Sequence, residues 1–170
     1  METSNKTQII KDLKNKKLKI TREFDAPVNQ VWNVWTQSEL LDQWWAPKPW
    51  KAKTKSMDFR EGGFWIYAMV GPDGSEQWCR VDYENIEPSK SFAGTDAFCD
   101  EKGNINHEMP VMHWKCIFNE STTGAILQID ITFKEEADIA KIVEMGFEEG
   151  FTAALTNLDE LLENKINSQG

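Results

Sequence analysis

The sequence has few of the residues that build metal, redox or disulfide sites. Its 170 residues include only two histidines and three cysteines, Cys79, Cys99 and Cys116. No His/Cys group has the spacing of a zinc site, so we expect no metal and no cofactor. An odd number of cysteines without paired spacing does not indicate a disulfide framework and favours a reducing, cytoplasmic location.

Positive charge and long apolar runs are also scarce. There are 19 Lys and Arg against 28 Asp and Glu, which gives a net charge of −9. Phosphate contacts need clustered basic side chains, so nucleic acid is not expected as a partner. No apolar run approaches the roughly 18 residues of a membrane span, and no signal-peptide core is seen near the N-terminus. We therefore expect no membrane partner.

Aromatic residues, by contrast, are abundant. Eight Trp and nine Phe are many for a chain of this length, and such side chains line cores, interfaces or ligand cavities. The length indicates one domain. Residues 1–15 are polar, with at most one weak helical turn around Ile9, Ile10 and Leu13, and we expect a flexible lead-in before a single domain at 16–165.

The C-terminal part of the chain carries a long amphipathic pattern. Between 136 and 163 apolar residues recur in steps of three and four, and acids occupy the opposite face, which predicts one long helix. Gly146, Gly150 and Ala154 make a lane of small side chains along its apolar face. The lane either lets the helix approach a sheet closely or leaves room for a ligand between them.

The residues before this helix predict strands and two short helices. Alternation over 17–24, with Leu18, Ile20, Arg22 and Phe24 on one side, indicates a half-buried strand. Two short helices follow, the first beginning at Pro27 and the second with a Thr36/Glu39 capping box. Six further strands, separated by turns, are expected at 51–59, 64–70, 76–86, 91–99, 109–119 and 125–133. This order belongs to the α+β class.

Four stretches resemble one known family. They are EFDAPVNQVWNVWTQSELLDQWWAP at 23–47, FREGGFWIYAMVGPDG at 59–74, YENIEPSKSF at 83–92 and MGFEEGFTAALTNLDELL at 145–162. The family is named after the activator of the heat-shock protein 90 ATPase and belongs to the START-like superfamily. The resemblance implies a helix-grip fold, in which a curved antiparallel sheet of seven strands encloses a long C-terminal helix. It also implies apolar small-molecule or lipid binding in many members, and a chaperone as a partner of the namesake, which uses an additional N-terminal domain.

The aromatic residues supply the candidate ligand-binding side chains. We expect Trp65 and Tyr67 to face the helix, and the Trp44–Trp45 pair to border a cavity mouth, with one of the two acting as a packing anchor. The full set of cavity candidates is Trp32, Trp35, Trp65, Tyr67, Trp78, His113, Trp114, Phe147 and Phe151. These rings either leave a cavity or fill the core completely, and the sequence leaves both alternatives open.

The other face of the strands raises two further alternatives. Phe64 and Ile66 would form an exposed apolar patch, which indicates an interface and a homodimer. Arg80, Asp82 and Glu84 alternate along one strand face, either inward on a polar ligand group or, as we favour, outward in solvent.

No catalytic residue can be assigned from the sequence. His113 is either a structural side chain or, with Tyr67, an acid–base group of an aromatase/cyclase-like enzyme. We favour a non-enzymatic protein that binds an apolar small molecule, with a protein-interaction module as the alternative.

Overall fold

The computed structural model describes residues 7–169, with side chains described as far as residue 164. Its strands are β1 (Thr7–Asp12), β2 (Lys17–Phe24), β3 (Lys51–Asp58), β4 (Phe64–Val70), β5 (Glu76–Glu87), β6 (Ser91–Phe98), β7 (Met112–Glu120) and β8 (Ala125–Thr132). Its helices are α1 (Val28–Thr36), α2 (Ser38–Trp44), α3 (Glu136–Glu144) and α4 (Phe147–Gln169).

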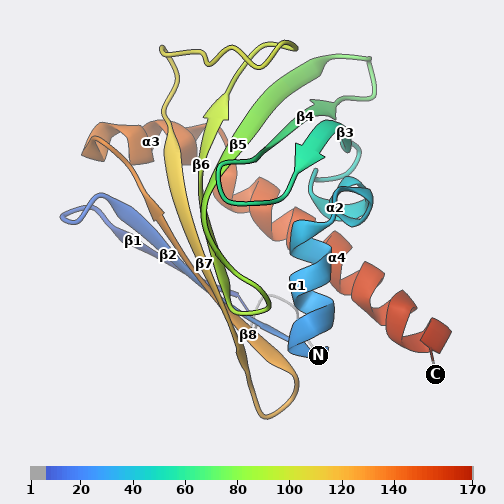
Figure 1. Cartoon of the computed structure of the whole chain (residues 1–170). Helices are drawn as coiled ribbons and strands as arrows, with labels where there is room; N and C mark the ends of the chain where they lie inside the picture. The colour runs from blue at the N-terminus through green and yellow to red at the C-terminus, as the bar shows by residue number, and fades with distance from the viewer. Residues whose placement is uncertain (1–6, 170) are drawn as a thin grey trace.

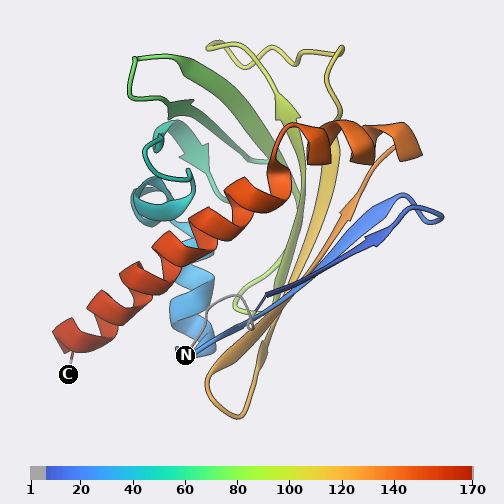
Figure 2. The same ribbon diagram turned by 180° about the vertical axis from the view of Figure 1, so that it is seen from behind.

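All eight strands form one antiparallel sheet, in the order β1-β2-β8-β7-β6-β5-β4-β3. The sheet curves strongly, and α4 crosses its concave side diagonally (Figure 1; Figure 2). The helices α1 and α2 lie on the same side, where α2 packs on β3 and α4. The predicted α+β helix-grip fold, with a curved antiparallel sheet and two short helices after strand β2, is confirmed.

The expected lead-in at 1–15 is wrong for the residues that the structure describes. Residues Thr7–Asp12 form strand β1, which pairs with β2 from Thr7 opposite Arg22 to Asp12 opposite Lys17. The sheet therefore has eight strands instead of seven. The expectation for residues 1–6 lies outside the described residues.

The single C-terminal helix expected at 136–163 is also wrong, because two helices occupy that range. Gly146 separates α3 from α4 with a φ of 92°, a left-handed conformation that glycine adopts without a Cβ penalty. Its N–H donates to the Val143 carbonyl, as at many helix C-termini. The long helix of the grip is α4 alone, and α3 turns away from it across the end of the sheet (Figure 2).

The predicted Thr36/Glu39 capping box does not form. The Thr36 hydroxyl donates instead to the Trp32 carbonyl, 2.8 Å away within α1. Gln37 is the N-cap of α2 and gives no side-chain hydrogen bond there. The tight α1–α2 connection leaves Thr36 inside the end of the first helix.

Two buried polar contacts fix the position of α4. Arg22 of β2, only 1% exposed, donates to both carboxylate oxygens of Asp159 at 2.5 Å, and its guanidinium lies over the Phe24 ring. Asn157 donates to the Ala46 carbonyl at 3.0 Å. The first contact ties α4 to the sheet and the second ties it to the chain that follows α2.

Candidate functional site

An apolar cavity lies between the sheet and the start of α4. It has a volume of about 220 Å³. Its described lining residues are Trp45, Pro47, Tyr67, Met69, Gln77, Cys79, Asp96, Ala97, Phe98, Met112, Trp114, Ile142, Met145, Gly146, Phe147, Gly150 and Phe151. The break between α3 and α4 thus lies at the cavity wall. At Gly146 and Gly150 no side chain extends into the cavity.

Aromatic rings form much of the cavity wall. Trp45 follows α2 and contacts Trp114 of β7 with ring centroids 6.0 Å apart. Phe147 and Phe151 stack on each other at 5.4 Å along the first turns of α4, and both rings contact Trp114 edge-on. The Trp45 indole N–H donates to the Tyr67 hydroxyl at 2.9 Å. The rings therefore come from the sheet, from α4 and from the segment after α2.

Trp44 and Trp45 have different roles. Trp44 is 1% exposed and its indole N–H donates to the Val34 carbonyl at 2.9 Å, so it anchors α2 on α1. Trp45 lines the large cavity and also a smaller one of about 30 Å³ beside it.

One acid lies on this apolar wall. Asp96 of β6 is 6% exposed and lines both cavities. It pairs with Met112 on β7 and Val81 on β5, both apolar. Within the described part of the chain, no side chain or backbone group donates a hydrogen bond to its carboxyl. Burial alone raises the pKa of Asp96 from its ordinary 3.8 to about 7.

The titratable neighbours of Asp96 are all neutral or acidic. Burial raises the pKa of Tyr67, Cys79 and Tyr83, and repulsion by the Asp96 carboxylate contributes in each case. Burial also raises the pKa of Cys99, just after β6, against the opposing effect of Arg80 on the other face of the sheet. None of the residues lining either cavity is Lys, Arg or His. The carboxyl group therefore lies among apolar side chains without a counter-charge.

Seven of the nine predicted cavity residues lie on the concave side of the sheet, at one of the two cavities or in the core. Tyr67, Trp114, Phe147 and Phe151 line the large cavity, and Trp35, Trp65 and Trp114 line the small one. Trp32 packs instead in the core, with its ring 5.2 Å from that of Phe118. The binding role of the lining residues stays a prediction.

Trp78 and His113 lie on the opposite face of the sheet, so their placement at a cavity is wrong. Trp78 alternates with the cavity residue Cys79, and the Lys55 ammonium lies 5.9 Å from its ring. His113 alternates with Met112 and Trp114, and its Nε2 lies 2.8 Å from a Glu84 carboxylate oxygen. Strand residues of opposite parity face opposite sides.

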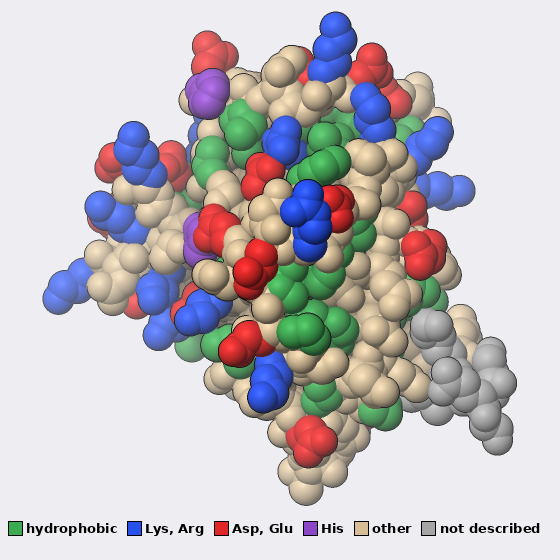
Figure 3. Space-filling view, in the orientation of Figure 1, with side chains coloured by type: hydrophobic (Ala, Val, Ile, Leu, Met, Phe, Trp, Pro, Cys, Tyr) green, Lys and Arg blue, Asp and Glu red, His purple; other side chains and the backbone are tan. Residues whose placement is uncertain are grey.

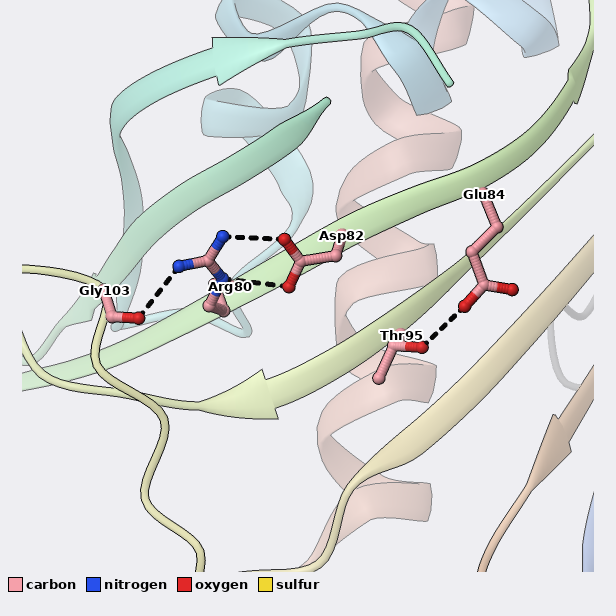
Figure 4. Close-up of polar contacts among 5 residues, drawn as sticks. All are labelled: Arg80, Asp82, Glu84, Thr95 and Gly103. Carbon is pink, nitrogen blue, oxygen red and sulfur yellow. Dashed lines mark hydrogen bonds and ion pairs between the residues drawn. The ribbon is translucent and has the colours of Figure 1, made fainter. Parts of the chain in front are cut away.

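The convex face carries polar contacts between strands. Arg80 makes two hydrogen bonds to the Asp82 carboxylate, at 2.9 and 2.6 Å, and one to the Gly103 carbonyl at 2.9 Å (Figure 4). Glu84 accepts from the Thr95 hydroxyl at 2.8 Å (Figure 4). Hydrogen bonds from His113 and then Thr95 hold the pKa of Glu84 below its usual range. The outward placement favoured for these three charged residues agrees with the structure.

The expected apolar patch at Phe64 and Ile66 is partly covered. Both side chains are half-buried. Arg80 lies 6.0 Å from the centre of the Phe64 ring, and the loop at Gly103 lies against Ile66. On this face hydrophobic side chains are interspersed with charged ones (Figure 3). The homodimer stays a prediction, and the exposed apolar patch on which it was based is partly covered.

Sequence reasoning missed Asp96, Met69, Cys79 and Met112 as cavity residues. A signal for Asp96 was present in SFAGTDAF, since Phe92, Gly94 and Asp96 share one parity and only the last is charged. An acid within the apolar alternation of a strand indicates a buried charge. The other three are apolar residues whose facing depends on strand register.

The described residues offer neither a membrane-spanning helix nor a metal site. No helix among them is long and apolar enough to cross a membrane. No three His, Cys, Asp or Glu side chains in that part of the chain gather as metal ligands would.

Comparison with known proteins identifies the family. The model of the family "Activator of Hsp90 ATPase homolog 1-like protein" matches residues 25–163. A solution structure of a protein from Arthrobacter aurescens is 32% identical, covers 92% of this chain and 91% of its own, and superimposes with a TM-score of 0.86. A crystal structure of a protein from Mycobacterium smegmatis is 31% identical over 92% of this chain and 96% of its own, with a TM-score of 0.84. A solution structure from Staphylococcus epidermidis is 28% identical over 93% of this chain and 94% of its own, with a TM-score of 0.81.

No curated protein matches this sequence. The family match covers most of the chain, and the similar structures share its architecture over nearly their whole length. The chain therefore belongs to the family of activator of Hsp90 ATPase homolog 1-like proteins.

Proposed function

We propose that this protein binds a small, largely apolar molecule in the cavity between the sheet and α4. The observation that carries the proposal is the cavity of about 220 Å³ whose wall is aromatic and aliphatic apart from Gln77 and Asp96. Ligand sites have this composition, with a few polar groups that fix orientation. An apolar cavity of roughly 150 Å³ holds benzene, so this one suits a single ring with a short chain.

Phenethyl alcohol is a suitable first probe, because it has one ring, a two-carbon chain and no charge. We expect a Kd of about a millimolar or tighter by isothermal titration calorimetry, from the burial of one apolar ring. No heat of binding from this probe or from benzene at saturating concentration would refute the proposal.

A variant that fills the cavity tests the location. A Cβ added at Gly150 would meet only the Pro47 ring, at 3.8 Å, so a larger side chain has room to extend into the cavity. Gly150→Leu is expected to abolish binding of phenethyl alcohol. Thr152→Leu adds apolar volume on the exposed side of the same helical turn and is the matched control. Equal affinity in the two variants would place the probe elsewhere.

A second proposal follows from the family description, which names an activator of a chaperone ATPase. We infer from it a heat-shock protein 90 chaperone as a protein partner, and a cytoplasmic location, which the free thiols of Cys79, Cys99 and Cys116 support. Adding this chain to the purified chaperone is expected to raise its ATPase rate. An unaltered rate together with no complex in sedimentation would refute this partner and leave the cavity proposal standing.

A further inference from the structure

We propose that the cavity selects a cationic amine, whose ammonium group pairs with the Asp96 carboxylate while its apolar body lies against the aromatic wall. This inference rests on the proposed cavity binding and names the chemical class of the ligand. Three independent observations support it: the position of the acid, the rings around it, and the charge of the surroundings.

The first observation is that Asp96 has no partner within the fold. Buried charged groups are normally paired, because an unpaired one costs free energy. Asp96 is only 6% exposed, yet no described residue donates a hydrogen bond to its carboxyl or forms an ion pair with it. Its two strand neighbours, Val81 and Met112, are apolar. A ligand that enters the cavity can supply the missing partner.

The second observation is the ring of aromatic side chains. Trp45, Tyr67, Trp114, Phe147 and Phe151 line the same cavity as the acid. Cations are attracted to the faces of such rings within about 6 Å, most strongly to tryptophan. Aromatic rings together with one carboxylate thus suit an ammonium group with an apolar substituent. An anionic ligand would meet the carboxylate without a compensating positive side chain.

The third observation is the electrostatics of the approach. Neither cavity has a basic residue in its wall. Glu149 lies in the first turn of α4, and one of its carboxylate oxygens lies 3.9 Å from a Cβ built on the lining residue Gly146. The adjacent Glu148 is paired with Lys11 at 3.2 Å. The chain as a whole carries a net charge of −9. Such a field concentrates cations and repels anions at the entrance.

The desolvation of the carboxyl also favours this ligand. Forming a buried ion pair normally requires both partners to lose water, which offsets most of the attraction. Here the fold has already removed most of the Asp96 side chain from water before the ligand arrives, so the carboxyl loses less hydration on binding than an exposed one would. The pair then satisfies an acceptor that the fold itself leaves unsatisfied.

The test compares three ligands of one shape: phenethylamine, phenethyl alcohol and phenylacetate. At pH 8.5 the Asp96 carboxyl, with a pKa of about 7, is ionised, and the amine is protonated because its pKa lies near that of lysine. We expect phenethylamine to bind at least about tenfold more tightly than the alcohol, as a charge-assisted hydrogen bond implies. Phenylacetate is expected to bind most weakly.

Asp96→Asn should bring the affinities of amine and alcohol within about twofold of each other. Glu84→Gln removes the same charge from the convex face and should keep the preference for the amine. If Asp96→Asn does not fold, the wild-type protein still decides, because its amine preference should disappear at pH 5.5, where Asp96 is protonated.

Failure of the Asp96 assignment and failure of cavity binding would give different results. Equal affinity for amine and alcohol in the wild-type protein at pH 8.5, or tighter binding of phenylacetate, would overturn the assignment of Asp96 and leave cavity binding intact. Absence of binding by all three probes would overturn cavity binding itself.

Discussion

The buried Asp96 carboxyl predicts a pH dependence of the free energy of unfolding that can be measured without a ligand. Its pKa is about 7 in the folded protein and near 3.8 in the unfolded chain. Between these values the folded state holds a proton that the unfolded state has lost, so the free energy of unfolding falls as the pH rises from about 4 to about 7. Three pKa units at 1.36 kcal/mol each correspond to about 4 kcal/mol.

The measurement is a pair of pH profiles. Urea unfolding of the wild-type protein and of Asp96→Asn, from pH 4.5 to 8.5, gives the free energy of unfolding of each. Other acids, such as Asp12, Asp73 and Asp100, have lowered pKa values and act in the opposite direction. They are the same in both proteins, so they cancel in the difference. The variant should gain about 3 kcal/mol relative to wild type between pH 4.5 and 8.5, because part of the full effect already lies below pH 4.5.

The direction of the pH dependence gives a further control, in the variant Glu84→Gln. Hydrogen bonds from His113 and Thr95 lower the pKa of Glu84, so its stabilisation is present above its unfolded pKa and is lost as the pH falls. Glu84→Gln should therefore diverge from wild type with the opposite slope below pH 4.5, so the profiles of this pair are extended to more acidic pH. Parallel profiles for wild type and Asp96→Asn would refute the reasoning, because they would mean that the carboxyl is hydrated or paired in the folded state.

Three further predictions concern stability and the outer face, each measured by urea unfolding at pH 7. Asp159→Ala should cost about 3 kcal/mol because it leaves the buried Arg22 guanidinium without its acceptor, and a cost below that of Arg22→Met would contradict this. Gly146→Ala should lower the free energy of unfolding by about 1 kcal/mol, because residue 146 has a left-handed conformation. Gly150→Ala should raise it by about 0.5–1 kcal/mol, because a Cβ has space there. Changes of the same sign in the two variants would count against the helix break at Gly146. His113→Gln should change stability by less than about 0.5 kcal/mol and leave phenethyl alcohol binding unaltered, since its contact with Glu84 is exposed.

Strand parity explains why some site residues could be predicted and others not. Arg80, Asp82 and Glu84 were placed outward, and Trp78 shares their parity on β5. An outward Arg80 therefore requires an outward Trp78. In the same way His113 and Trp114 are adjacent on β7, so they cannot both face the cavity. The residue types pointed to a cavity, and a consistent register would have removed two of the nine candidates.

The two errors of secondary structure have different physical origins. In β1 the residues Ile9 and Ile10 are adjacent, which breaks the alternation that identifies a half-buried strand. Ile10 is 57% exposed, because β1 is an edge strand held by its pairing with β2, a contact that no local pattern reveals. The break at Gly146 was readable in principle, since glycine is the preferred residue just past a helix end. The amphipathic pattern that continues on both sides of it concealed the break.

Three departures from a stability-optimised fold coincide at one place. A helix is interrupted at Gly146, a cavity of about 220 Å³ is left open beside it, and the unpaired Asp96 carboxyl lines that cavity. The cavity and the acid each cost free energy, since unfilled volume and uncompensated buried charge both destabilise a fold. A leucine at position 150 and an apolar residue at position 96 would remove two of these costs without altering the sheet. Because local rules are broken mainly where function requires it, their coincidence argues for a bound ligand more strongly than any one of them alone.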